Sequence, residues 1–180
     1  GNVRRFLEKP SPDEITCDTI NAGIYVLEPE TFDRIPDDTP WSIERKYFPS
    51  LVERSETFVA YIDRGYWLDI GRPADYVRAH RDLMTQRCPV GPFAGAPAAS
   101  VHRAGPCDVA ADAQIDGPCF LGAGAVVGAG ARIGPETVLG PGCRVGPGAV
   151  VDHAILWRDT IIEADCIVRD AVLGERCRLG

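Results

Sequence analysis

Two charged side chains in the first half of the chain are of types that handle phosphate groups and their metal ions. Lys9 follows a predicted strand and is fixed by Pro10, so its ammonium group suits a phosphate as a point charge. Asp69 is flanked by bulky apolar residues and should emerge from a buried strand. Its carboxylate is a ligand that Mg²⁺ takes together with phosphate oxygens and water. Taken singly, Lys9 could equally be a solvated surface lysine, and Asp69 the cap of the helix that follows.

The elements that would position these residues alternate between strands and helices. Apolar runs predict strands over residues 3–7, 20–27, 57–62 and 65–70. Ser42 is a suitable N-cap for a helix over 43–54, and Pro73 opens another with apolar residues on one stripe. The alternation favours an α/β fold. The elements are too few for a complete nucleotide-binding domain.

The second half of the chain carries an internal repeat of six residues. Large aliphatic residues recur at Val109, Ile115, Leu121, Val127, Ile133, Leu139, Val145 and Val151, and again at Ile162, Val168, Leu173 and Leu179. This period fits neither an amphipathic helix nor an alternating strand. It suits coils of three short strands whose aliphatic side chains stack into one core. Glycine in the next position is expected to supply the turn conformations.

Small residues occupy a second inward position of each hexad, four places after the aliphatic residue. Five of the seven cysteines fall in this phase: Cys107, Cys119, Cys143, Cys166 and Cys177. We therefore interpret them as small buried hydrophobes and not as metal or redox groups. The frame breaks over 152–161, where we expect a loop or widened turn. Trp157 in this break is expected to pack over a coil face or to contact another subunit.

Four segments resemble the sugar-1-phosphate nucleotidyltransferase family and occur in that family's order: F-L-E-K-P (6–10), I-N-A-G-I-Y (20–25), S-I-E-R-K-Y-F-P (42–49) and G-Y-W-L-D-I-G-R-P-A-D-Y (65–76). The hexads resemble left-handed parallel β-helices, and their place after these segments resembles the mannose-1-phosphate guanylyltransferase branch. The resemblance implies the C-terminal part of an α/β nucleotidyltransferase domain followed by an all-β, left-handed parallel β-helix. We place these parts at 1–87 and 107–180, with a Pro-, Ala- and Gly-rich linker over 88–106.

The reaction implied by the resemblance joins a sugar 1-phosphate to a nucleoside triphosphate and releases pyrophosphate, with Mg²⁺ as cofactor. Lys9 matches the lysine that holds the sugar phosphate, and Asp69 matches the metal-binding aspartate. Glu8 matches a carboxylate that accepts hydrogen bonds from sugar hydroxyls, although it could simply pair with a nearby arginine. Asn21 matches a residue whose amide contacts the sugar, and Gly23 would let a ring approach the backbone closely. Both could instead form a turn at a strand end.

Other features of that family do not occur in these 180 residues. The glycine-rich loop for the triphosphate, a second metal aspartate and the base-recognition strands are all missing. We therefore expect a sequence truncated at both ends, inactive alone, that supplies the sugar-phosphate side and the β-helix. The nucleotide, GTP by resemblance, and the sugar, mannose 1-phosphate by resemblance, are not decided by the residues present.

Composition and charge limit which classes of partner the chain can have besides the proposed substrates. A net charge of −7 offers no basic stripe for nucleic acid. The sequence has neither an apolar run long enough to span a bilayer nor an apolar leader, so we expect a cytoplasmic protein without a membrane partner. The β-helix favours a homo-oligomer. Two alternatives remain: a non-catalytic regulatory or assembly subunit, and a hexapeptide acyltransferase with His153 as its base.

Overall fold

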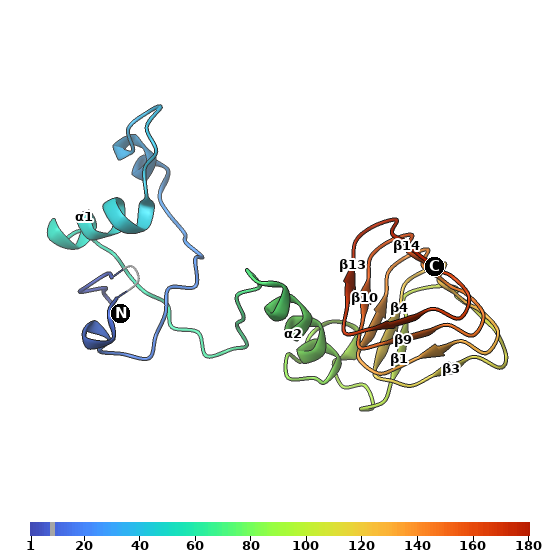
Figure 1. Ribbon diagram of the computed structural model, residues 1–180. Coiled ribbons are helices and arrows are strands. Elements are labelled where there is room, and N and C mark those ends of the chain that lie inside the picture. Colours follow the sequence, from blue (N-terminus) through green and yellow to red (C-terminus); the bar gives the residue numbers. More distant parts are fainter. Residues whose placement is uncertain (8–9) are drawn as a thin grey trace. The chain divides into compact units, whose positions relative to one another are not determined.

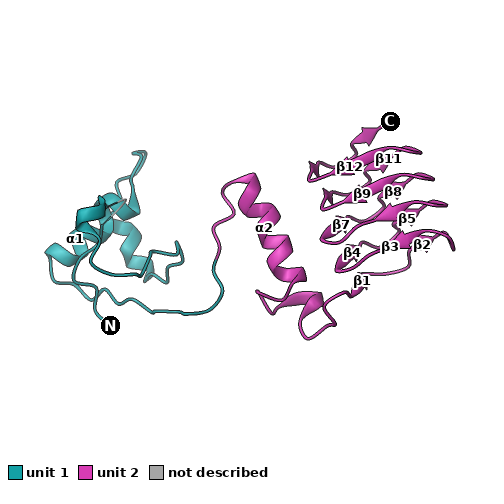
Figure 2. Cartoon of the chain, turned by 60° about the horizontal axis from the view of Figure 1, so that its bottom comes forward, with its two compact units in different colours: residues 1–67 teal, residues 68–180 magenta. Residues whose placement is uncertain are grey.

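The computed structural model describes residues 1–7 and 10–180. The chain forms two compact units, Gly1–Trp67 and Leu68–Gly180, drawn in different colours in Figure 2. The helix that was predicted to begin at Pro73 therefore belongs to the same unit as the hexad repeat. The sequence-based boundary at residue 87 lies after this helix, because only long-range contacts reveal which unit holds it.

The first unit consists of short helices around a small aromatic core. Its helices are the 3₁₀ helices Pro12–Glu14 and Pro29–Arg34, the π-helix Ile43–Tyr47, and α1, Phe48–Glu53, which continues that π-helix (Figure 1). Ser42 caps the π-helix as predicted, with its hydroxyl accepting from the Arg45 amide at 3.1 Å. Phe48 is fully buried, and the rings of Phe6, Tyr25 and Phe58 lie around it with centroids 4.8–5.1 Å away. Ring packing thus organises this unit.

The strands predicted in the first 70 residues do not form. Among the described residues of this part, strand-like pairing is limited to a bridge between Asn2 and Val59. The segment 20–27 was predicted to be a largely buried strand, yet Ile24 is 81% exposed and Val26 100%. Its apolar composition was identified correctly, but an extended segment becomes a strand only when a neighbour takes up its backbone hydrogen bonds.

The second unit is a parallel β-solenoid with α2, Pro73–Met84, beside it (Figures 1 and 2). The strands are β1 Val101–Arg103, β2 Asp108–Val109, β3 Gln114–Ile115, β4 Cys119–Leu121, β5 Val126–Val127, β6 Arg132–Ile133, β7 Thr137–Leu139, β8 Arg144–Val145, β9 Val150–Asp152, β10 Ile155–Leu156, β11 Ile161–Ile162, β12 Ile167–Arg169, β13 Val172–Leu173 and β14 Arg178–Leu179. They form sheets in the orders β1-β4-β7-β10-β13, β14-β11-β8-β5-β2 and β12-β9-β6-β3. This is the stacking that the period of six predicted for a left-handed β-helix.

The predicted inward positions form the core of the solenoid. Stacked residues pair in register, as in the column Leu121, Leu139 and Leu156. The central aliphatic positions are at most 4% exposed, and those at either end are partly buried: Leu121, Val127, Ile133, Leu139, Val145, Val151, Ile162 and Val168 in the centre, with Val109, Ile115, Leu173 and Leu179 at the ends. Each buried side chain contributes about 1.5–3 kcal/mol relative to exposure.

The frame break is a shortened turn and not the expected loop. The strands β9, β10 and β11 follow one another without interruption, and β10 pairs with both β7 and β13. The spacing between inward residues falls from six to five at Val151–Leu156 and again at Val168–Leu173. His153 and Asp170 close these shorter turns with φ of 48° and 49°. The solenoid also begins at Val101, inside the segment predicted to be a linker, because β1 pairs with β4.

The five cysteines predicted to face inward differ in burial, since Cys107, Cys166 and Cys177 are only partly buried, while Cys17 of the first unit is exposed. Cys119 and Cys143 are fully buried, and burial raises the pKa of the Cys119 thiol to about 11 and that of Cys143 above its usual value. A hydrogen bond from the Thr19 hydroxyl lowers the pKa of Cys17. We expect iodoacetamide at pH 8 to label Cys17 rapidly and the two buried thiols only after unfolding in urea, because the thiolate is the reactive form. Peptide mass spectrometry checks this order. Equal labelling of Cys119 in the native protein would contradict its role as a core residue.

Candidate functional site

Asn21 lies in a hydrogen-bonded cluster with two other polar side chains of the first unit. Its amide nitrogen donates to the Tyr25 hydroxyl at 2.6 Å and to Glu44 Oε1 at 2.8 Å. The Tyr25 hydroxyl also donates to Glu44 Oε1, at 2.9 Å. Tyr25 is held by the aromatic core and Glu44 by the capped π-helix, so both partners are fixed by the fold. The cluster presents a carboxylate and an amide oriented by one another, which suits recognition of neighbouring hydroxyl groups.

Gly23 belongs to the same local structure. Its amide donates to Asn21 Oδ1 at 3.1 Å, and its φ is 73°. Among the described residues, apart from its two chain neighbours, none has an atom within 4 Å of the place where a side chain would begin. The turn with positive φ accounts for the glycine, and the backbone is open on this side. The close approach of a sugar ring to Gly23 stays a prediction.

Glu44 and Tyr25 were not among the predicted site residues. Both lie inside segments that carry the family resemblance, 42–49 and 20–25. Their proximity to Asn21 depends on a contact between residues 23 positions apart. Sequence spacing gives no direct signal for such a contact. The residue types did offer a clue, since a glutamate beside a good helix cap is held in a defined position.

Asp69 lies in the second unit, in an exposed turn that leads into α2. It does not emerge from a buried strand as predicted, because residues 65–70 form no strand and Ile70 is 55% exposed. Asp69 Oδ1 accepts from the Gly71 amide at 3.0 Å. Among the described residues no three acidic, histidine or cysteine side chains gather as a metal cage. A single carboxylate supplemented by phosphate oxygens is nevertheless a donor set that Mg²⁺ accepts.

The other two predicted site residues, Glu8 and Lys9, lie outside the described residues. The structure brings Asn21 and Gly23 together in the first unit and places Asp69 in the second. Arg5, an arginine near Glu8 in the sequence, forms an ion pair with Glu14, with 3.7 Å between Nη2 and Oε1.

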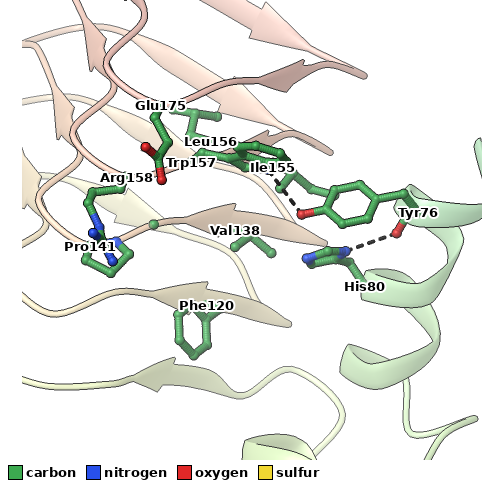
Figure 3. A pocket seen from close by; sticks show the side chains of 11 residues that line it. Tyr76, His80, Phe120, Val138, Pro141, Ile155, Leu156, Trp157, Arg158 and Glu175 are labelled. Atoms are coloured by element: carbon green, nitrogen blue, oxygen red, sulfur yellow. Dashed lines mark hydrogen bonds between the residues drawn. The ribbon is translucent and has the colours of Figure 1, made fainter. Parts of the chain in front are cut away.

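A shallow groove of about 320 Å³ lies between α2 and the solenoid (Figure 3). Tyr76 and His80 of α2 line one side, and the wall opposite is formed by residues of the solenoid: Phe120, Val138, Gly140, Pro141, Ile155, Leu156, Trp157, Arg158 and Glu175. Trp157 Nε1 donates to the Tyr76 hydroxyl at 3.1 Å across this groove. Trp157, expected to pack over a coil face or to contact another subunit, therefore contacts α2 of its own unit.

His153, the candidate base of an acyltransferase, contacts its own neighbour. Its Nδ1 lies 2.8 Å from Asp152 Oδ1 in the shortened turn. It does not line the groove between α2 and the solenoid. The Asp152–His153 contact follows from the geometry of the turn.

Two family models match most of the chain. Residues 1–86 match the model described as nucleotidyl transferase, and residues 115–180 match the one described as the GMPPB C-terminal domain. The first part of the chain is thus similar to nucleotidyl transferases, and the second part to the GMPPB C-terminal domain. The predicted order of a nucleotidyl transferase segment before a β-solenoid is thereby confirmed.

Several curated relatives cover part of the chain. It is 41% identical over 92 residues to the probable mannose-1-phosphate guanylyltransferase 2 of Arabidopsis thaliana, a match over 49% of this chain and 24% of that protein. It is 42% identical over 83 residues to the mannose-1-phosphate guanylyltransferase of Mycobacterium tuberculosis, over 46% of this chain and 23% of that protein. The chain thus spans about a quarter of the length of these relatives. Within the part of the chain that the structure describes, no helix has the length and apolar character needed to cross a membrane.

Proposed function

We propose that this chain provides the sugar-phosphate side of an enzyme that transfers a nucleotidyl group to mannose 1-phosphate, with GTP as the donor. The match of residues 1–86 to the nucleotidyl transferase model and the names of the relatives support the reaction class. The observation in the molecule that carries the proposal is the cluster of Asn21, Tyr25 and Glu44 beside the open backbone of Gly23. It offers fixed polar atoms at a place where a sugar ring can approach.

In the proposed reaction a phosphate oxygen of the sugar 1-phosphate attacks the α-phosphorus of the nucleotide. The bond between the α-phosphorus and the bridging oxygen breaks, and pyrophosphate leaves. The Glu44 carboxylate accepts hydrogen bonds from sugar hydroxyls. The Asn21 amide contacts the sugar and also keeps that carboxylate oriented. Lys9 neutralises the sugar phosphate as a point charge, and Glu8 accepts a further sugar hydroxyl.

Asp69 would hold Mg²⁺ in this scheme. When bound, the ion neutralises the negative charge that accumulates where the phosphate groups meet. The role of Asp69 is to present its carboxylate in a defined place, and its turn is ordered by the hydrogen bond from the Gly71 amide.

Calorimetric titration of the purified chain with mannose 1-phosphate in the presence of Mg²⁺ tests the proposal. We expect binding that Lys9→Ala weakens at least about tenfold, because a charge-assisted phosphate contact is lost. Lys46→Ala is the matched control, since this lysine lies over the Trp41 ring, 4.3 Å from its centroid, and should leave affinity unchanged. Absence of binding by a folded chain, or equal loss in both variants, would reject the assignment of the sugar-phosphate side.

A further inference from the structure

The residue proposed to hold Mg²⁺ belongs to the unit that contains the solenoid. That unit begins at Leu68, one residue before Asp69, and α2 begins four residues after Asp69. The intervening turn is closed by the hydrogen bond from the Gly71 amide to Asp69 Oδ1. Whatever fixes α2 therefore also fixes the turn that presents the Asp69 carboxylate.

Arg72 joins this turn to the helix. Its carbonyl accepts from the amides of Asp75 and Tyr76, at 3.0 Å each, as the first contacts of α2. Its guanidinium donates to Asp75 Oδ2 at 2.7 Å, and Asp75 is mostly buried as a side chain. The Asp69 carboxylate is thus connected to the first turn of α2 through the hydrogen bond from the Gly71 amide and the hydrogen bonds of the next residue, Arg72.

The solenoid holds α2 at two positions along the helix. Near its start, the Tyr76 hydroxyl accepts from Trp157 Nε1 at 3.1 Å, and the two rings meet edge to face with centroids 6.2 Å apart (Figure 3). Five residues later, Arg81 pairs with Glu136 of the solenoid. Tyr76 is itself braced by His80, whose ring lies 4.5 Å away. Two contacts on one helix resist both translation and rotation, which a single contact would not.

We propose that Trp157 and Glu136 are positioning residues for the Asp69 carboxylate. By holding α2 against the solenoid, they fix the turn that presents this carboxylate to metal and phosphate. The solenoid thereby takes part in presenting the Asp69 carboxylate as well as in architecture. This inference rests on the proposed function for the role of Asp69, while the mechanical link rests on the contacts alone.

Two readouts test the link in the purified chain. Electron paramagnetic resonance measures binding of Mn²⁺, as a probe for Mg²⁺, in the presence of mannose 1-phosphate. NMR measures hydrogen exchange of the Gly71 amide, which donates to Asp69. The variants are Trp157→Phe, which keeps the ring and removes its donor, and Glu136→Gln. Glu163→Gln is the matched control, because Glu163 pairs with Arg178 inside the solenoid and away from α2.

We expect Trp157→Phe to weaken Mn²⁺ binding about two- to tenfold, because the variant loses one hydrogen bond. Glu136→Gln should have a smaller effect, because an exposed ion pair contributes little. Both should speed exchange at Gly71, and Glu163→Gln should change neither readout. Circular dichroism confirms that each variant is folded. Unchanged Gly71 exchange in both variants would overturn the link. If exchange rises while Asp69→Asn leaves Mn²⁺ binding intact, the link stands and the proposed metal role of Asp69 is wrong.

Discussion

Ile133→Ala should lower the free energy of unfolding of the solenoid by about 2–5 kcal/mol, the cost of a buried isoleucine replaced by alanine. Ile133 is fully buried in β6, between Ile115 of β3 and Val151 of β9 in register. Each coil contributes only a few large side chains, and its neighbours cannot close the cavity without breaking their own ladder. Urea titration followed by circular dichroism measures the change.

Ile167→Ala is the matched control for this prediction. The same side chain is removed from β12, where Ile167 points outward and is 63% exposed. The expected loss is within about 0.5 kcal/mol, as for an exposed position. If the two variants lost equal stability, the assignment of inward and outward positions in the solenoid would be wrong.

The solenoid was predictable from sequence because its pattern repeats locally. Every coil gives an independent reading of which position faces inward, so the buried residues could be assigned before any contact was known. The shortened turns at His153 and Asp170 could not be assigned in this way. A missing residue breaks the periodicity in the same manner as an insertion, and only the uninterrupted pairing of β10 with β7 shows that the turn became tighter.

The first unit and the link to α2 were less predictable because they depend on distant contacts. The hydrogen bond between Trp157 and Tyr76 joins residues 81 positions apart. Glu44 meets Asn21 only because Phe48 gathers rings from three segments. Apolar runs without an adjacent partner were taken for strands, although the pairing of a strand is not encoded in its own residues.

Gly122→Ala should destabilise the solenoid by more than about 2 kcal/mol, because the added methyl group has no room beside the backbone of the next coil. A Cβ at this position would lie 2.5 Å from the Pro141 nitrogen and 2.6 Å from the Gly140 carbonyl carbon, both backbone atoms of the next coil. Gly122 has no positive φ. The glycine that follows the aliphatic residue is therefore required by the close approach of coils, and the turn-forming role predicted for it is wrong.

The turn-forming glycines lie two positions later, and one of them supplies the control. Gly130 has φ of 64°, and apart from its chain neighbours no described residue has an atom within 4 Å of the place where its Cβ would be. Gly130→Ala should cost about 1–2 kcal/mol from the left-handed conformation alone. Gly130→Asn should cost less, because asparagine tolerates this conformation, as Asp165 does at the corresponding turn with φ of 60°. Thermal unfolding of the three variants separates the two causes. Gly122→Ala should have the lowest unfolding temperature of the three. If it unfolds at the same temperature as Gly130→Asn, the coils can move apart to make room for the added methyl group.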